Sequence, residues 1–190
     1  MTKHPIGIFI SGRGSNLESI IKASRDNNFP AKISIVFSDN PYAKGIKLAH
    51  ENHIKAVSLD FSQFKDKDDF DNQILKLIKP YNLKLICLAG YMKILSKKFI
   101  DNFTGEIINI HPSLLPKYKG LNTHRRALEN NETVSGCTVH YVNENLDDGD
   151  IVLQKEVVID SSDTEDTLAN KILQVEHLLY PEAIKLVLKK

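Results

Sequence analysis

Residues 5–26 read PIGIFISGRGSNLESIIKASRD, and they join a short apolar run to a helical pattern through a turn that contains glycine. Residues 5–10 are apolar on both faces, which is typical of a strand buried inside a parallel sheet. Residues 16–26 carry apolar side chains at helical spacing. A strand that leads directly into a helix through such a turn predicts the first unit of a parallel α/β fold.

The same alternation continues through the first half of the chain. Further apolar runs are typical of buried strands, and the segments between them have helical periodicity. Strands are expected at 32–38, 55–59, 83–89 and 106–110, and helices at 42–52, 68–79 and 96–102. This alternation predicts a mostly parallel central sheet with helices on both faces.

The pattern changes after residue 110. Residues 111–121 contain two prolines and predict a long shaped loop, and a short helix is expected at 123–130 with Thr123 as a candidate cap. Residues 137–142 and 151–159 alternate as strands do, and only a short acidic loop separates them. They are therefore expected to be antiparallel neighbours.

A last helix is expected to start at residues 163–164 and to bend or stop near Pro181. The chain shows no internal repeat, low-complexity tract or linker. We therefore predict one α/β domain over residues 1–190. Its fold should be Rossmann-like, with an antiparallel C-terminal part added to a mostly parallel sheet.

The composition narrows the classes of function. Lys and Arg total 25 and Asp and Glu total 24, so the net charge of +1 gives no field that would attract nucleic acid or a membrane surface. Cys87 and Cys137 lie in apolar runs and are expected to be buried thiols. Without a signal-peptide pattern or a long apolar run, the expected compartment is the cytoplasm.

The turn SGRGSN at residues 11–16 is a candidate phosphate site. Gly12 and Gly14 let the backbone approach a ligand, and the helix that follows offers free N–H groups at its positive end. Tight strand–helix turns also need glycine for steric reasons alone. Leu17 replaces the third glycine of a dinucleotide fingerprint, and no Lys–Ser/Thr pair follows. A single phosphate is the remaining ligand, with donors from residues 14–16.

Asn109 and His111 stand two residues apart at the end of the fifth expected strand, so they should point to the same side. That edge of a parallel sheet is where ligands bind. An amide can stabilise an oxyanion, and histidine suits proton transfer near neutral pH. A purely structural histidine is the alternative. Pro112 and Pro116 should stiffen the loop that follows.

The loop NENLDDGD at residues 143–150 supplies carboxylates. Asp147 or Asp148 beside an imidazole would orient the ring and favour its charged form. A solvated turn is the usual role of such an acidic cluster. Chain spacing alone does not place this loop beside His111.

Five segments, in this order, resemble the phosphoribosylglycinamide formyltransferase family: ISGRGSNLESII, LAGYMKILS, IINIHPSLLPKYKGLNTHRRALE, GCTVHYVNENLDDGDIVLQ and VEHLLYP. The resemblance covers nearly the whole chain, from about Gly7 to Pro181. It implies an enzyme that transfers the formyl group of 10-formyltetrahydrofolate to the primary amine of 5'-phosphoribosylglycinamide. It also implies small-molecule partners only, with the protein as a monomer or homodimer.

The resemblance assigns roles to particular residues. The implied catalytic residues are Asn109, His111 and Asp147. The residues implied to bind the ribonucleotide and its phosphate are Gly14, Ser15, Asn16 and Glu176. The residues implied to bind folate are Lys67, Met92, Lys93, Ile94, Leu95, Asn109, Asn143, Glu144, Asn145, Leu146 and Asp147. Lys67 and Lys93 stand where relatives carry arginine, and a lysine at position 67 offers a point charge in place of the bidentate contact of arginine.

The expected chemistry needs no enzyme nucleophile and no metal. Asn109 and a protonated His111 would stabilise the developing oxyanion, and Asp147 would position His111 and raise its pKa. The other histidines have no metal-ligand spacing, although His124 and His140 could shape the pocket.

The main alternative is a formyltetrahydrofolate hydrolase, which passes the formyl group to water. Relatives of that kind carry an N-terminal regulatory domain, and a methionyl-tRNA formyltransferase needs a C-terminal domain and a basic RNA-binding surface. An amino-sugar formyltransferase is disfavoured for the same reasons. A non-catalytic sensor would not need the Asn–His–Asp set, and a nicotinamide oxidoreductase would need the missing third glycine.

Overall fold

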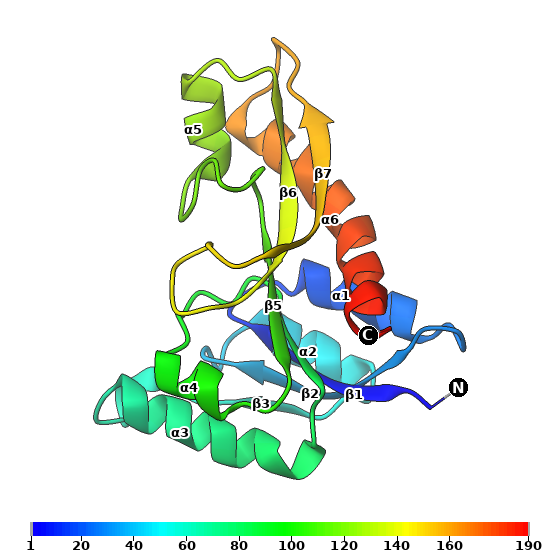
Figure 1. The fold of residues 1–190 in the computed structure, drawn as a ribbon, viewed down its shortest axis with the longest axis vertical. Coiled ribbons are helices and arrows are strands. Elements are labelled where there is room, and N and C mark those ends of the chain that lie inside the picture. Colours follow the sequence, from blue (N-terminus) through cyan, green and yellow to red (C-terminus); the bar gives the residue numbers. More distant parts are fainter. Residues whose placement is uncertain (1, 190) are drawn as a thin grey trace.

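The computed structural model describes residues 2–189, which fold as one α/β domain around a seven-stranded sheet (Figure 1). The strands are β1 His4–Ile10, β2 Ala31–Ser38, β3 Ala56–Ser58, β4 Leu85–Leu88, β5 Glu106–His111, β6 Val134–Tyr141 and β7 Ile151–Val158. The α-helices are α1 Ser15–Ser24, α2 Lys44–Glu51, α3 Lys67–Ile78, α4 Lys97–Asn102, α5 Thr123–Glu129 and α6 Glu165–Val187. The predicted fold class is confirmed.

The order of the strands, β3-β2-β1-β4-β5-β6-β7, creates a crevice in the sheet. The first five strands are parallel, and β6 and β7 are antiparallel to their neighbours as predicted. After β3 the chain returns to the other side of β1 and forms β4. The helices that follow β1 and β4 then pack on opposite faces. Such a reversal opens a ligand site at the carboxyl ends of the strands.

Helices cover both faces of the sheet. One core layer joins α1, α2 and α6 to the sheet and contains Leu17, Ile20 and Tyr180. The other joins α3 and α4 to the opposite face, where the rings of Phe9 and Phe37 lie 4.9 Å apart between centroids. Burying each such side chain stabilises the fold by about 1.5–3 kcal/mol. The two layers explain why strands β1, β2 and β4 are apolar on both sides.

The sequence predicts that the last helix bends or stops near Pro181. The helix does not stop there but continues to Val187. The Tyr180 hydroxyl donates hydrogen bonds to the carbonyl oxygens of Leu88 and Ile108, at 2.9 and 3.1 Å. Tyr180, Pro181, Ala183 and Ile184 of α6 are buried. This packing outweighs the cost of about 3 kcal/mol that an internal proline imposes on an isolated helix.

Two further expectations have clear outcomes. Thr123 is not the cap of α5 but its first residue, because Asn122 occupies the cap position with a φ of 57° and makes no side-chain capping bond. Cys87 and Cys137 are buried free thiols, as predicted, and burial raises the pKa of Cys137 to about 12. Within residues 2–189, no helix combines the length and apolar character needed to cross a membrane.

Candidate active site

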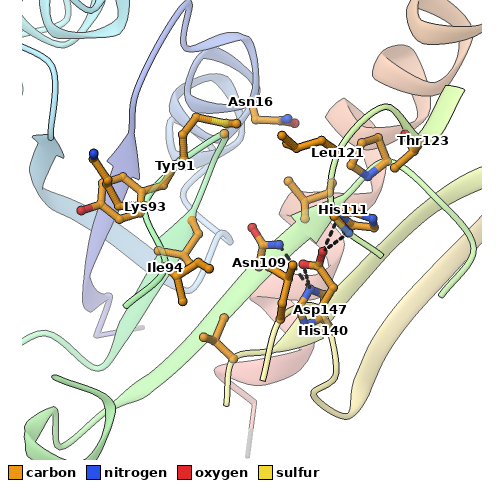
Figure 2. Close-up of a pocket in the computed structure, with 18 of the residues that line it drawn as sticks. Asn16, Tyr91, Lys93, Ile94, Asn109, His111, Leu121, Thr123, His140 and Asp147 are labelled. Atoms are coloured by element: carbon orange, nitrogen blue, oxygen red, sulfur yellow. Dashed lines mark hydrogen bonds and ion pairs between the residues drawn. The ribbon is translucent and has the colours of Figure 1, made fainter. Parts of the chain in front are cut away.

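A cavity of about 460 Å³ opens at the carboxyl ends of β1, β4 and β5, at the reversal in strand order (Figure 2). This volume lies in the usual range of small-molecule sites. Its lining residues come from α1, from β4 and β5 and the segments that follow them, from the start of α5, from β6 and its acidic loop, and from α6. They are Asn16, Leu88, 90–95, 109–112, 120–124, His140, Val142, Asn143, 145–147, Glu165 and Glu176.

His111 is the last residue of β5, and both of its ring nitrogens face oxygen atoms. Nε2 lies 2.9 Å from the carbonyl oxygen of Tyr118. A carbonyl can only accept, so Nε2 carries a proton in this contact. Nδ1 lies 3.3 Å from Oδ2 of Asp147. Nδ1 is therefore the ring nitrogen that can gain or lose a proton inside the cavity.

Asp147 reaches His111 from the loop between β6 and β7. Its Oδ2 accepts a hydrogen bond of 2.9 Å from the backbone N–H of Gly120, and its backbone has a φ of 48°. Only 9% of its side chain is exposed. The acidic loop is therefore not a solvated turn at this position, and the structure brings the carboxylate to the imidazole as the resemblance implies.

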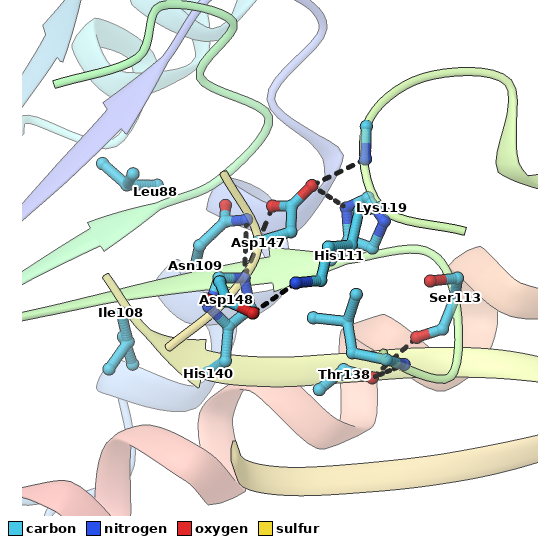
Figure 3. A network of polar contacts seen from close by, with 12 residues as sticks. Leu88, Ile108, Asn109, His111, Ser113, Lys119, Thr138, His140, Asp147 and Asp148 are labelled. Atoms are coloured by element: carbon cyan, nitrogen blue, oxygen red, sulfur yellow. Dashed lines mark hydrogen bonds and ion pairs between the residues drawn. The ribbon is translucent and has the colours of Figure 1, made fainter. Parts of the chain in front are cut away.

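Asn109 lies in the same cluster, two residues before His111 on β5 (Figure 3). Its side-chain nitrogen is 3.2 Å from Nε2 of His140, which is its partner across the β5–β6 ladder. Nδ1 of His140 lies 2.8 Å from the carbonyl oxygen of Tyr141. His140 was predicted only to shape the pocket, and it is in direct contact with one of the implied catalytic residues.

Two opposing effects act on the pKa of His111. The expected effect of Asp147 is confirmed, because its carboxylate raises the pKa of His111, as does the Tyr118 carbonyl. Burial disfavours the charged form and outweighs both, so the pKa of His111 is lowered overall. Burial also raises the pKa of Asp147, but contacts with His140, the Gly120 N–H and His111 outweigh it, so this carboxyl has a lowered pKa.

The glycine turn lies at the start of α1. Gly14 has a φ of 81°, and a Cβ atom there would lie 2.9 Å from Cα of Gly45. Asn16 is buried and donates a hydrogen bond of 2.8 Å to Oε2 of Glu176, while its own Oδ1 has no partner. Asn16 and Glu176 line the cavity, whereas Gly14 and Ser15 do not. The turn therefore needs glycine for packing as well as for any ligand.

The segment after β4 forms the other end of the cavity. Met92, Lys93, Ile94 and Leu95 all line it. The backbone N–H of Met92 donates to the Ser11 hydroxyl at 2.8 Å, which fixes the segment against the glycine turn. The ammonium of Lys93 lies 4.7 Å from the centre of the Phe61 ring. The charged end of the Lys93 side chain therefore contacts another side chain of the protein.

The acidic loop contributes most of the other residues implied to bind folate. Asn143, Asn145, Leu146 and Asp147 line the cavity. Two implied residues do not. Lys67 is an exposed residue at the start of α3, and Glu144 forms an ion pair of 3.3 Å with Lys97.

Sequence reasoning missed several lining residues. Tyr91, Leu121 and Glu165 lack a pattern that marks them before the fold is known. His124, which was noted as a candidate, has a buried Nε2 with no partner, and burial lowers its pKa. The position of His124 in the sequence, directly after the loop that contains Gly120, is the feature that made it a candidate pocket residue. Within residues 2–189, no group of three or more His, Cys, Asp or Glu side chains is arranged to hold a metal ion.

The family model for formyl transferases matches residues 5–184. The chain belongs to the formyl transferase family. The match starts inside β1 and ends inside α6, so it includes every residue that lines the cavity.

Similar proteins in the family carry names that refer to purine biosynthesis or to phosphoribosylglycinamide formyltransferase. The chain is 40% identical over 185 residues to the human trifunctional purine biosynthetic protein adenosine-3, but it spans only 18% of that protein's length. It is 40% identical to phosphoribosylglycinamide formyltransferase of Escherichia coli (strain K12), covering 94% of this chain and 84% of that protein. The solved structure of the Brucella melitensis phosphoribosylglycinamide formyltransferase is similar with a TM-score of 0.93. It is 43% identical, over 97% of this chain and 95% of that one.

Proposed function

We propose that this protein transfers the formyl group of 10-formyltetrahydrofolate to the primary amine of 5'-phosphoribosylglycinamide, a step of purine biosynthesis. The observation that carries the proposal is the meeting of Asn109, His111 and Asp147 inside one cavity. The relatives named phosphoribosylglycinamide formyltransferase, at about 40% identity, support the choice of amine.

In the proposed reaction, the amine nitrogen forms a bond to the formyl carbon while the bond from that carbon to N10 of the folate breaks. The proton lost by the amine ends on N10. Burial lowers the pKa of His111, which favours the neutral form of the ring, and this form can accept the proton at Nδ1. The resulting cation lies beside the carboxylate of Asp147 and the carbonyl of Tyr118, which both favour it.

Asn109 supplies a hydrogen-bond donor to the formyl oxygen as negative charge develops there. Removing one such donor typically costs about 2.7–4 kcal/mol of transition-state stabilisation. In Figure 2 the Asn109 side chain lies between His111 and Ile94, and all three line the cavity. The charged His111 adds a second stabilising group at the same place.

The ribonucleotide is proposed to bind at the start of α1. The N–H groups of Gly14, Ser15 and Asn16 lie at the positive end of this ten-residue helix, which favours a phosphate. Glu176 is buried beside Asn16, and its carboxylate can accept hydrogen bonds from ribose hydroxyls. The unpartnered Oδ1 of Asn16 also needs a donor.

The folate is proposed to bind between Met92–Leu95 and residues 143–147. Apolar side chains of Met92, Ile94 and Leu146 remain at least half exposed, as suits contact with a planar ring system. Lys67 and Glu144 are proposed as outer contacts to the folate. 10-Formyltetrahydrofolate is a co-substrate that supplies the one-carbon unit.

The experiment combines the protein with 10-formyltetrahydrofolate, with and without 5'-phosphoribosylglycinamide, and follows folate absorbance. Turnover that requires the amine supports the proposal, whereas equal turnover without it indicates the hydrolase. Asn16→Ala should weaken binding of the ribonucleotide more than binding of the folate. Equal weakening of both ligands would contradict the proposed phosphate site.

We also propose that the protein acts in the cytoplasm, on small molecules rather than nucleic acid or membranes, without a metal, and as a single-domain monomer or homodimer. The near balance of 25 basic and 24 acidic residues supports small-molecule ligands rather than nucleic acid or membranes.

A further inference from the structure

His140 and Asn109 form a cross-strand pair whose hydrogen-bond direction can be deduced. They are register partners between β5 and β6, and the amide nitrogen of Asn109 lies 3.2 Å from Nε2 of His140. The pairing of β6 with β7 shifts register at His140, between Val139 and His140. Such irregularities re-aim side chains and are frequent beside active sites.

The surroundings of His140 select one form of its ring. Nδ1 lies 2.8 Å from the carbonyl oxygen of Tyr141, which can only accept, so Nδ1 carries the proton. In the neutral ring, Nε2 then has a free lone pair and accepts a hydrogen bond from the Asn109 amide. Oδ1 of Asp147 lies 3.6 Å from Nε2, so the contact with the Asn109 amide nitrogen at 3.2 Å is the shorter of the two.

We propose that His140 is a positioning residue for formyl transfer, because its Nε2 lone pair fixes which end of the Asn109 amide faces the reacting oxygen. One N–H of the amide is bound to His140, and the other is left to donate to the formyl oxygen. An amide rotated by half a turn would present its carbonyl oxygen, which repels a developing oxyanion. This proposal rests on the proposed function.

Only one form of His140 performs this role. If Nε2 carried a proton, it would face the amide nitrogen, and two donors would oppose each other. The Asn109 amide would then reverse. Two titratable groups lie close to the ring: the carboxylate of Asp147 and the imidazole of His111. The interaction therefore links Asn109 to the same cluster that positions His111.

A pair of variants tests the role of the acceptor. His140→Leu removes the Nε2 lone pair, whereas His140→Gln can place an oxygen near the same point. We expect His140→Leu to lower kcat by about ten- to a hundredfold, which is less than the 10²–10³-fold that follows complete loss of an oxyanion donor. KM for both substrates should change little, and His140→Gln should recover most of the lost rate.

A double-mutant cycle separates positioning from general disruption. Once Asn109 is replaced by alanine, His140→Leu should cause no further loss of kcat, because its effect passes through the amide. Equal losses in His140→Leu and His140→Gln, or additive losses with Asn109→Ala, would overturn the proposal. Thermal unfolding of each variant identifies a loss that comes from misfolding.

A spectroscopic measurement on the unmodified protein tests the same point without turnover. Two-bond ¹H–¹⁵N correlations of the histidine rings report which nitrogen carries the proton. His140, assigned by the signal that disappears in His140→Gln, should show a protonated Nδ1 and an unprotonated Nε2. A proton on Nε2 would overturn the proposal. Failure of the proposed function is a separate result, seen as absence of amine-dependent turnover in the same sample.

Discussion

Nδ1 of His111 lies 3.3 Å from Oδ2 of Asp147, and the two side chains are only 7% and 9% exposed. They come from the end of β5 and from the loop between β6 and β7. The segment after β5 holds both of them, because the Tyr118 carbonyl contacts His111 and the Gly120 N–H donates to Asp147. One short stretch of backbone therefore sets the geometry of the acid–base pair.

Replacing His111 by alanine should lower kcat by about 10²–10⁴-fold, the usual contribution of a positioned acid–base group. Binding of both substrates should remain, because the two proposed binding regions lie on other segments. Steady-state kinetics and thermal unfolding of the same preparation measure the two effects. His50→Ala, an exposed histidine on α2, is the matched control and should retain the unmodified rate. Comparable rates in the two variants would contradict the role of His111.

The pH dependence of kcat/KM should follow His111. The neutral ring accepts the proton, so kcat/KM should fall as the pH drops and the ring becomes charged. Burial lowers the pKa of His111, which places this fall below the ordinary histidine range. Asp147 raises that pKa, so Asp147→Asn should move the fall to still lower pH. A profile that stays in place or moves to higher pH in the variant would rule out this coupling.

Glu176→Gln should stabilise the fold at neutral pH. Burial raises the pKa of Glu176, with a smaller opposing effect from Asn16. Stability from a group with a raised folded pKa is present below its unfolded pKa and is lost as the pH rises through the folded value. Relative to the unmodified protein, the variant should therefore gain unfolding free energy as the pH rises from about 5 to about 8.

Urea denaturation at both pH values measures this gain. Glu182→Gln is the control, since Glu182 is 61% exposed and pairs with Lys185 on the surface. The control should show no such pH-dependent gain. If Glu176→Gln and Glu182→Gln show the same pH-dependent change in unfolding free energy, the buried carboxylate of Glu176 does not destabilise the fold at higher pH.

An ion pair outside the cavity should affect turnover more than stability. Lys119, next to Gly120, pairs with Asp148, next to Asp147, and both side chains are partly exposed. Exposed pairs contribute about 0–1 kcal/mol. Lys119→Asp and Asp148→Lys should each lower kcat by up to about fivefold, because they loosen the two loops that hold Asp147.

The double exchange, Lys119→Asp with Asp148→Lys, should restore the rate, and high salt should weaken all of these differences. Measuring kcat for the four proteins at low and high ionic strength completes the cycle. A double variant that is no faster than the single ones would show that the pair has no positioning role.

The regular elements could be predicted because the information is local. The apolar runs that form β1, β2 and β4 are buried on both sides, and helical periodicity marks α1 and α3. The sequence predicts that the last helix bends or stops at Pro181. The helix does not stop there, because Tyr180 packs against the sheet in a way that is not visible in local sequence.

The site itself could be predicted only in part. The spacing of Asn109 and His111 on one strand shows that they share a face, since two residues is the period of a strand. The contact between Asn109 and His140 depends on the register of β5 against β6, which the sequence does not contain. The approach of Asp147 depends on loop geometry, and only the family resemblance indicated it. The lowered pKa of His111 follows from burial, which requires the fold.

The transfer of a ¹³C-labelled formyl group, followed by NMR in the unmodified protein and in Asp147→Asn, is the most direct test of the Asn109–His111–Asp147 assignment. The label should move from the folate to the amine of 5'-phosphoribosylglycinamide in the unmodified protein. In the folded variant it should move at least about a hundredfold more slowly. Equal transfer rates in the two proteins, or release of labelled formate independent of the amine, would contradict it.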